Sequence, residues 1–236
     1  MISGMSGTRD VSPRLRGRSH RGAKGDIAKF ARQFIKGRLE GFEKDMRICL
    51  TPIKLKTGSG VTHAYLPALA ACCGILEYLT ALWRGNTRRI GWQQIADFAE
   101  HFLPQPDFNR ETVRVLFEVF RHPVAHRGIL SGVWVDRNNG TGAGRRLTWK
   151  VSADAKRPAC EVVAETGVLR LDPPWPCSYT HRGHIHLRSL WGDIRKAATR
   201  YGNTIATDHQ LQVSFNACMR QLYPVSRGKR DGVENR

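Results

Sequence analysis

Three side chains that can bind a phosphodiester or transfer a proton to it lie close together in the stretch RHPVAHRG, residues 121–128. Arg121 offers a fixed charge and a planar fork of N–H donors that matches phosphate oxygens. His122 and His126 offer imidazoles, whose ordinary pKa of about 6.5 lets them give or take a proton near neutral pH. An arginine and a histidine in one site are sufficient to cleave a phosphodiester through attack by a ribose 2′-hydroxyl, and this scheme requires no metal.

The position of this stretch in the chain bears on whether the three side chains can meet. It follows the amphipathic segment ETVRVLFEVF, residues 111–120. Pro123 disfavours helical backbone at His122 and fits best in the first turn of a new helix. The sequence therefore predicts a helix that stops or kinks near Arg121 and a second helical segment that starts at Pro123. Arg121 and His126 could then project into the same space.

The pattern Arg121-x4-His126, with the polar His122 directly after the arginine, resembles the R-x4-6-H signature of the HEPN superfamily (higher eukaryotes and prokaryotes nucleotide-binding). The resemblance covers the motif and, loosely, residues 26–130. It implies a helical bundle and, as in many members, a metal-independent endoribonuclease without a cofactor. In that scheme Arg121 would hold the scissile phosphate, His126 would act as general acid or base, and His122 would orient the site.

The same resemblance implies partners. Two such motifs usually meet across a homodimer or pseudo-dimer to form one composite site, so we expect a homodimer that acts on RNA. Members of the superfamily work as toxins, in phage defence or in RNA processing. A toxin of this kind would have an antitoxin or another partner protein.

Two other interpretations of the motif stay open. Arg121, His122 and Arg127 could complement the carbonyl end of a helix, with His126 as a hydrogen-bonded core residue. Alternatively, the chain could be a basic nucleic-acid-binding or defence-associated interaction protein without catalysis. Salt-dependent binding would be common to this alternative and to the nuclease.

The net charge of the chain favours an anionic partner. It carries 38 lysines and arginines against 20 acids, a formal charge of +18. Residues 1–25 hold six of the cations and one acid, so the remainder still carries 32 cations against 19 acids. Nucleic acid is the first expectation, and an anionic membrane surface is the second.

Several arginines outside the motif are candidates for contacts with RNA. The segments RGNTRRIGW (84–92) and GRRLTWK (144–150) mix cations with Trp92 and Trp149, which could stack on bases. A solvated basic edge with core tryptophans is the alternative for each segment. The candidate nucleic-acid-binding residues are Arg88, Arg89, Arg127, Arg145, Arg146, Arg182 and Arg188.

A second group of reactive residues lies in CSYTHRGHIHLRSLW, residues 177–191. Its potential zinc ligands are Cys177, His181, His184 and His186. Cysteine and histidine are good zinc ligands, but this spacing matches no familiar zinc template. In an extended segment His184 and His186 would share a face. A polar surface strand or helix entry is therefore the main expectation, with zinc or phosphate binding as alternatives.

Apolar periodicity predicts the elements that must position these residues. The expected fold is α+β and mainly α. It has about four helices within residues 26–130, a small antiparallel β-meander over 131–172 and two closing helices over 187–223. Gly202 or Asn203 should end the first closing helix. We expect one domain over 26–223, a disordered basic tail over 1–25 and a loose tail over 224–236.

Other features of the sequence exclude whole classes of protein. There is no P-loop, G-x-G-x-x-G, H-E-x-x-H or G-x-S-x-G pattern, which argues against ATPases, Rossmann enzymes, zincins and α/β-hydrolases. The N-terminus lacks the apolar stretch of a secretory signal, and the six cysteines form no C-x-x-C pair. The apolar run at 66–83 contains Glu77 and is expected to be a buried helix rather than a membrane span. We therefore expect a cytoplasmic protein.

Overall fold

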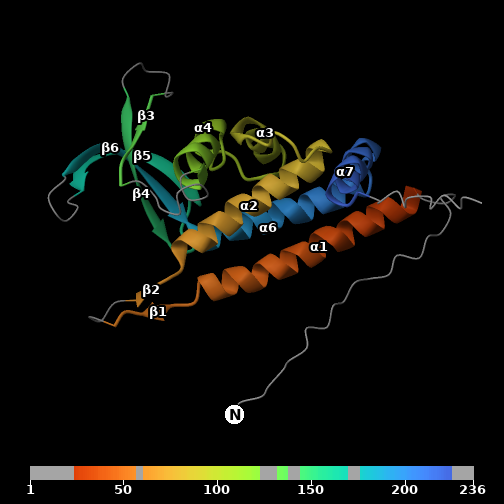
Figure 1. Ribbon diagram of the computed structural model, residues 1–236, viewed down its shortest axis with the longest axis horizontal. Helices are drawn as coiled ribbons and strands as arrows, with labels where there is room; N and C mark the ends of the chain where they lie inside the picture. The colour runs from red at the N-terminus through yellow and green to blue at the C-terminus, as the bar shows by residue number, and fades with distance from the viewer. Residues whose placement is uncertain (1–23, 57–60, 123–131, 138–143, 170–175, 225–236) are drawn as a thin grey trace, which may run out of the picture.

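The computed structural model describes residues 24–56, 61–122, 132–137, 144–169 and 176–224. Within these ranges six helical stretches and a four-stranded sheet form a mainly helical α+β fold, as the sequence predicts. The sheet lies at one end of the molecule, on the left in Figure 1, and α7 lies at the other end.

Three long helices form the body of the protein. α1 (Lys24–Cys49), α2 (Tyr65–Arg84) and α6 (Leu187–Ile205) contact one another along their lengths (Figure 1). α3 (Trp92–Phe102) and α4 (Arg110–Val115) lie on the side of α2 away from α1. α7 (His209–Leu222) packs against α2. One continuous cluster of buried apolar side chains joins these helices to the sheet.

α2 is the central helix of the core. Ten of its residues are buried, among them Leu69, Cys73 and Leu76. It is the one helix in the described part of the chain that is long and apolar enough to cross a membrane. The core helix of a folded domain passes the same test, and more than half of this apolar stretch is buried inside the protein. Its C-terminus is capped by Gly85, whose φ of 73° is the left-handed conformation that glycine favours.

The helix before the motif changes its winding near its end. Asn109 caps α4 by accepting a hydrogen bond from the N–H of Thr112, at 2.9 Å. The helix then continues as a π-helix, η1 (Leu116–Arg121), in which the N–H of His122 bonds to the carbonyl of Phe117. A π-turn holds an extra residue, so it changes the directions in which the side chains that follow it point, and such turns are frequent at functional sites.

The sheet contains four strands in the order β3-β4-β6-β5. The strands are β3 (Trp134–Asp136), β4 (Arg145–Ser152), β5 (Cys160–Leu169) and β6 (Cys177–His186). β6 lies between β4 and β5, parallel to β4 and antiparallel to β5. The sheet is therefore mixed, which corrects the predicted antiparallel meander. The reason is that the polar segment at 177–186, expected at the surface, supplies a central strand.

Phe120 joins this sheet to the helices. A Cβ added to Gly183 in β6 would lie 2.8 Å from Cζ of Phe120, so the ring occupies the space that any other residue would need. Gly183 and Phe120 are both buried. This contact places the last turn of η1, and Arg121 with it, beside the sheet.

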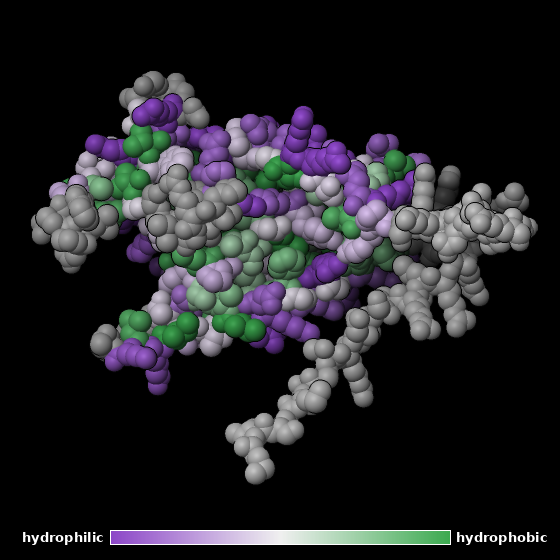
Figure 2. Space-filling model, viewed as in Figure 1, coloured by the Kyte–Doolittle hydropathy of each residue, from purple (hydrophilic) through white to green (hydrophobic). Residues whose placement is uncertain are grey.

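Two further details differ from the expectations. Gly202 does not end α6, which continues to Ile205, because this glycine is buried within the helix beside Ile35 of α1. A small hairpin of β1 (Ile53–Lys54) and β2 (Val61–Thr62) lies between α1 and α2. Ile53 and Leu55 leave apolar surface exposed at this hairpin (Figure 2).

Candidate functional site

A cleft of about 800 Å³ lies beside the end of η1. Arg121 and His122, the first two residues of the predicted motif, both line it. The other lining residues come from α2, from the α2–α3 connection with the start of α3, from η1, and from β3 with the residue that follows it. They are Glu77, Ile90, Gly91, Trp92, Phe117, Glu118, Trp134, Val135, Asp136 and Arg137. The cleft thus lies between the helical body and the edge strand of the sheet.

Arg121 is held in this cleft by Glu77 of α2. Its Nε lies 2.6 Å from Oε1 of Glu77 and its Nη2 donates to Oε2 at 2.8 Å. This is the two-point geometry in which a guanidinium binds a carboxylate most strongly. A guanidinium has five N–H donors. Among the described residues, Glu77 takes two of them, which leaves three for the oxygens of a ligand.

Two tryptophans give the cleft aromatic walls. Trp92 is the first residue of α3 and Trp134 is the first residue of β3, and both are partly exposed. The α3 helix starts at this point because the side chain of Gln94 accepts a hydrogen bond from the N–H of Gly91, at 2.9 Å. Aromatic side chains of this kind can stack on unpaired bases.

Carboxylates balance the arginines of the cleft. Glu77, Glu118 and Asp136 line it together with Arg121 and Arg137. Asp136 is buried and binds Arg114 of α4 through a contact of 2.7 Å between Oδ2 and Nη2. These hydrogen bonds raise the pKa of Arg114 above its usual range. The described lining of the cleft is therefore not strongly basic, although the protein as a whole is.

The rest of the motif falls outside the described residues. His126 and Arg127 belong to the range 123–131, as does Pro123. His122 is exposed at the mouth of the cleft. Of the predicted catalytic residues, the structure thus brings Arg121 and His122 together.

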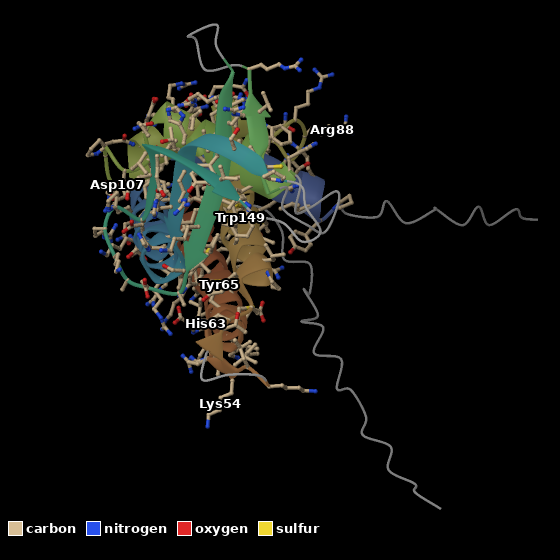
Figure 3. The ribbon with its side chains drawn as sticks, turned by 90° about the vertical axis from the view of Figure 1, so that its left-hand side faces the viewer. Lys54, His63, Tyr65, Arg88, Asp107 and Trp149 are labelled. Carbon is tan, nitrogen blue, oxygen red and sulfur yellow. The ribbon has the colours of Figure 1, made fainter. Side chains whose placement is uncertain are left out.

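The predicted nucleic-acid-binding arginines that the structure describes lie on several different elements, and Arg127 lies outside the described residues. Arg88 and Arg89 are exposed in the connection between α2 and α3. Arg146 is exposed on β4, and Arg145 beside it is engaged by Asp136 at 2.7 Å and by Glu111. Figure 3 shows Arg88 at the upper right of the molecule and Trp149 near its middle, within the sheet.

The two predicted arginines of the segment 177–191, Arg182 and Arg188, also have protein partners. Arg182 of β6 lies 2.9 Å from Glu165 and stacks over the ring of Tyr179. Arg188 at the start of α6 is exposed, and its Nη2 donates to the carbonyl of Leu50 at 3.2 Å. Neither lines the cleft.

The cysteine and histidines of β6 lie on both faces of the strand. The alternation of a strand puts His181 on the face of Tyr179 and Ile185, whereas His184 and His186 share the other face. His186 contacts the hydroxyl of Ser152 at 2.9 Å, and Nε2 of His184 is 3.8 Å from Glu165. Across the described ranges, no three His, Cys, Asp or Glu side chains are grouped so that they could hold a metal ion.

Sequence reasoning missed five charged or aromatic residues of the cleft: Glu77, Glu118, Trp134, Asp136 and Arg137. One signal for Glu77 was present, because an acid in the middle of an apolar helix needs a cationic partner when it is buried. Nothing in the spacing of the sequence connects position 77 with position 121. Trp134 and Arg137 reach the cleft through the edge strand, whose place depends on the mixed sheet.

Comparison of the chain with protein-family models, with curated proteins and with solved structures finds no match.

Proposed function

We propose that this protein is a HEPN-like, metal-independent endoribonuclease whose reaction takes place in the cleft at the end of η1. The observation that carries the proposal is the position of Arg121 and His122. They are adjacent in the motif and line a cleft of about 800 Å³ together with two tryptophans. The high positive charge of the chain adds support, because RNA is a polyanion.

The reaction would proceed through the ribose next to the scissile phosphate. The 2′-hydroxyl attacks phosphorus, the bond to the 5′-oxygen of the next nucleotide breaks, and a 2′,3′-cyclic phosphate and a 5′-hydroxyl result. In this scheme Arg121 holds the phosphate with the donors that Glu77 leaves available. His126 transfers the proton, His122 orients the site, and Trp92 and Trp134 stack on the flanking bases.

The test is cleavage of end-labelled RNA in the presence of EDTA. The wild-type protein should produce 2′,3′-cyclic ends, and Arg121→Ala and His126→Ala should each lower the rate by a factor of about 100 or more. Arg220→Ala, an exposed change on α7, is the matched control. Wild-type rates in either motif variant would contradict the proposal, provided that circular dichroism shows both variants folded.

A second candidate is a basic nucleic-acid-binding or defence-associated protein that does not cleave. The observation in its favour is the ion pair of Arg121 with Glu77, which offsets the charge that a catalytic arginine would present to a phosphate. It predicts salt-dependent RNA binding without cleavage, equal in wild type and in His126→Ala.

A toxin or phage-defence role and a homodimer with a composite site belong to the nuclease proposal. Expression of the wild type should then arrest growth of a host cell, and Arg121→Ala should not. Mixing two inactive variants tests the dimer, because activity returns only where a site draws residues from both chains.

A further inference from the structure

The cleft at the end of η1 does not account for the charge of the protein. Among the described residues, three carboxylates line it beside two arginines. If RNA is the substrate, most of its phosphates must be bound elsewhere. The following inference rests on the proposed function in that respect.

The cations gather instead between α1 and α6. Three adjoining clefts of about 580, 410 and 500 Å³ follow the line along which these two helices pack. All three share Arg195, and the first two share Arg47 as well. They therefore form one continuous trough. Its cations are Lys36, Lys44, Arg47, Arg188, Arg195, Lys196 and Arg200.

The helical repeat explains why these side chains line up. Lys36, Lys44 and Arg47 are separated by eight and three residues along α1, which places them on one stripe. Arg188 and Arg195 are seven residues apart on α6 and form the facing stripe. Gly192 and Thr199, which are small, lie on the same stripe of α6 as these two arginines. The trough is thus walled by long cations and left open between them.

Only two acids, Glu40 and Glu43, line the described trough. Glu43 binds Nη1 of Arg195 at 3.1 Å and accepts a hydrogen bond from Nε1 of Trp191 at 3.0 Å. Glu40 lies 4.0 Å from Lys36, and both side chains are highly exposed. The described trough therefore has seven cations and two acids, whereas the described lining of the cleft has two arginines and three carboxylates.

We propose that the trough between α1 and α6 binds the sugar-phosphate backbone of RNA. From Lys36 to Arg47 it spans about 16 Å at 1.5 Å per helical residue, enough for about five phosphates at the 3.4 Å spacing of a helical strand. Bases are not read there, since the buried Trp191 is the one aromatic residue among those lining the described trough. In the described part of the chain the trough and the cleft share no lining residue, so the trough supplies affinity and the cleft carries out the reaction.

Binding of an unstructured 20-nucleotide RNA over a range of salt concentrations tests this proposal. The variant combines Lys44→Ala with Lys196→Ala, two exposed cations of the trough. The control combines Lys156→Ala with Arg220→Ala, two exposed cations in the β4–β5 connection and on α7. The slope of log K against log salt should fall by about 1.4 in the trough variant, because each lost phosphate contact removes about 0.7. The control should retain the wild-type slope.

Equal slopes in wild type and trough variant, or no RNA binding by the wild type, would overturn the proposal. Vesicles of phosphatidylserine and phosphatidylcholine provide a further comparison. If the trough variant no longer binds these vesicles but still binds RNA as the wild type does, the trough binds membranes instead of RNA.

A tetranucleotide substrate, which has few phosphates to place outside the cleft, separates this proposal from the proposed function. The trough variant should cleave it at the wild-type rate. If no RNA is cleaved but binding still depends on Lys44 and Lys196, the nuclease fails and the trough stands.

Discussion

Glu77 of α2 and Arg121 of η1 form an ion pair although they are 44 positions apart in the chain. Both side chains are partly buried, so water screens the pair less than it screens a surface ion pair. The fork of Arg121 is thereby fixed in direction before any ligand arrives. A preformed donor of this kind is what electrostatic stabilisation of a reacting phosphate requires.

Glu77→Gln should lower the free energy of unfolding by about 1 kcal/mol, because it removes the charge from a two-point ion pair that is only partly exposed. Glu40→Gln breaks the exposed pair with Lys36 and should change stability by about 0.3 kcal/mol or less. Urea unfolding of both variants measures the difference. Equal losses would show that the Glu77–Arg121 pair contributes no more than a surface contact.

The six cysteines should react at two very different rates. Cys72, Cys73, Cys160 and Cys218 are buried, whereas Cys49 and Cys177 are partly exposed. Burial raises the pKa of Cys73 and Cys160 well above the usual range and that of Cys218 to about 11. Ellman's reagent at pH 8 should thus titrate two thiols rapidly in the native protein and six after denaturation. Rapid reaction of four or more native thiols would mean that the core is open.

At the scale of elements, the contact of η1 with β6 decides where the cleft lies. The ring of Phe120 fits against a glycine, and Arg121 follows it in the same turn. A side chain at position 183 would force η1 and the sheet apart.

Gly183→Ala should cost about 1–3 kcal/mol, the usual range for overpacking in a filled core. Gly41→Ala on α1 is the control, since a Cβ there meets nothing within 4 Å and alanine favours a helix by about 1 kcal/mol. Thermal unfolding should therefore shift in opposite directions. Combining Gly183→Ala with Phe120→Leu should recover part of the loss, and an additive double variant would contradict the contact.

Helices and strands were not equally predictable from the sequence. The helices follow the apolar repeat, so their cores at positions such as Leu116 and Leu190 could be placed from spacing alone. β6 could not be placed in this way, because one of its faces carries Arg182, His184 and His186, a pattern that is typical of an exposed strand. Its parallel pairing with β4 also depends on contacts between segments that are not consecutive. Glu77 was missed for the same reason, since pairing between distant helices leaves no periodic signal.

At the scale of the whole molecule, a network of ion pairs joins the helices to the sheet. Arg114 of α4 contacts Glu111 and Glu118 at 3.0 Å on its own helix and Asp136 of β3 at 2.7 Å. Arg145 of β4 reaches the same Asp136. Asp136 thus connects the sheet to α4 through Arg114, and Arg145 makes a second connection through Glu111 of α4.

Asp136→Ala should destabilise the protein by about 3 kcal/mol, because it leaves the buried guanidinium of Arg114 without its strongest partner. The exposed acid Asp45 on α1 provides the control, and its replacement by alanine should change stability by about 0.5 kcal/mol or less. Chemical denaturation measures both. Similar losses in the two variants would show that the network does not hold the sheet in place.

The order of strands in the sheet also sets the order in which a ribosome can complete it. β4 and β5 emerge first but do not pair with each other, since the place between them belongs to β6. Until residues 177–186 have left the exit tunnel, each of the two strands presents an edge with unpaired N–H and C=O groups. A nascent chain halted before Cys177 would thus be prone to pair with other chains, and the strand richest in histidine is the one that ends this exposure.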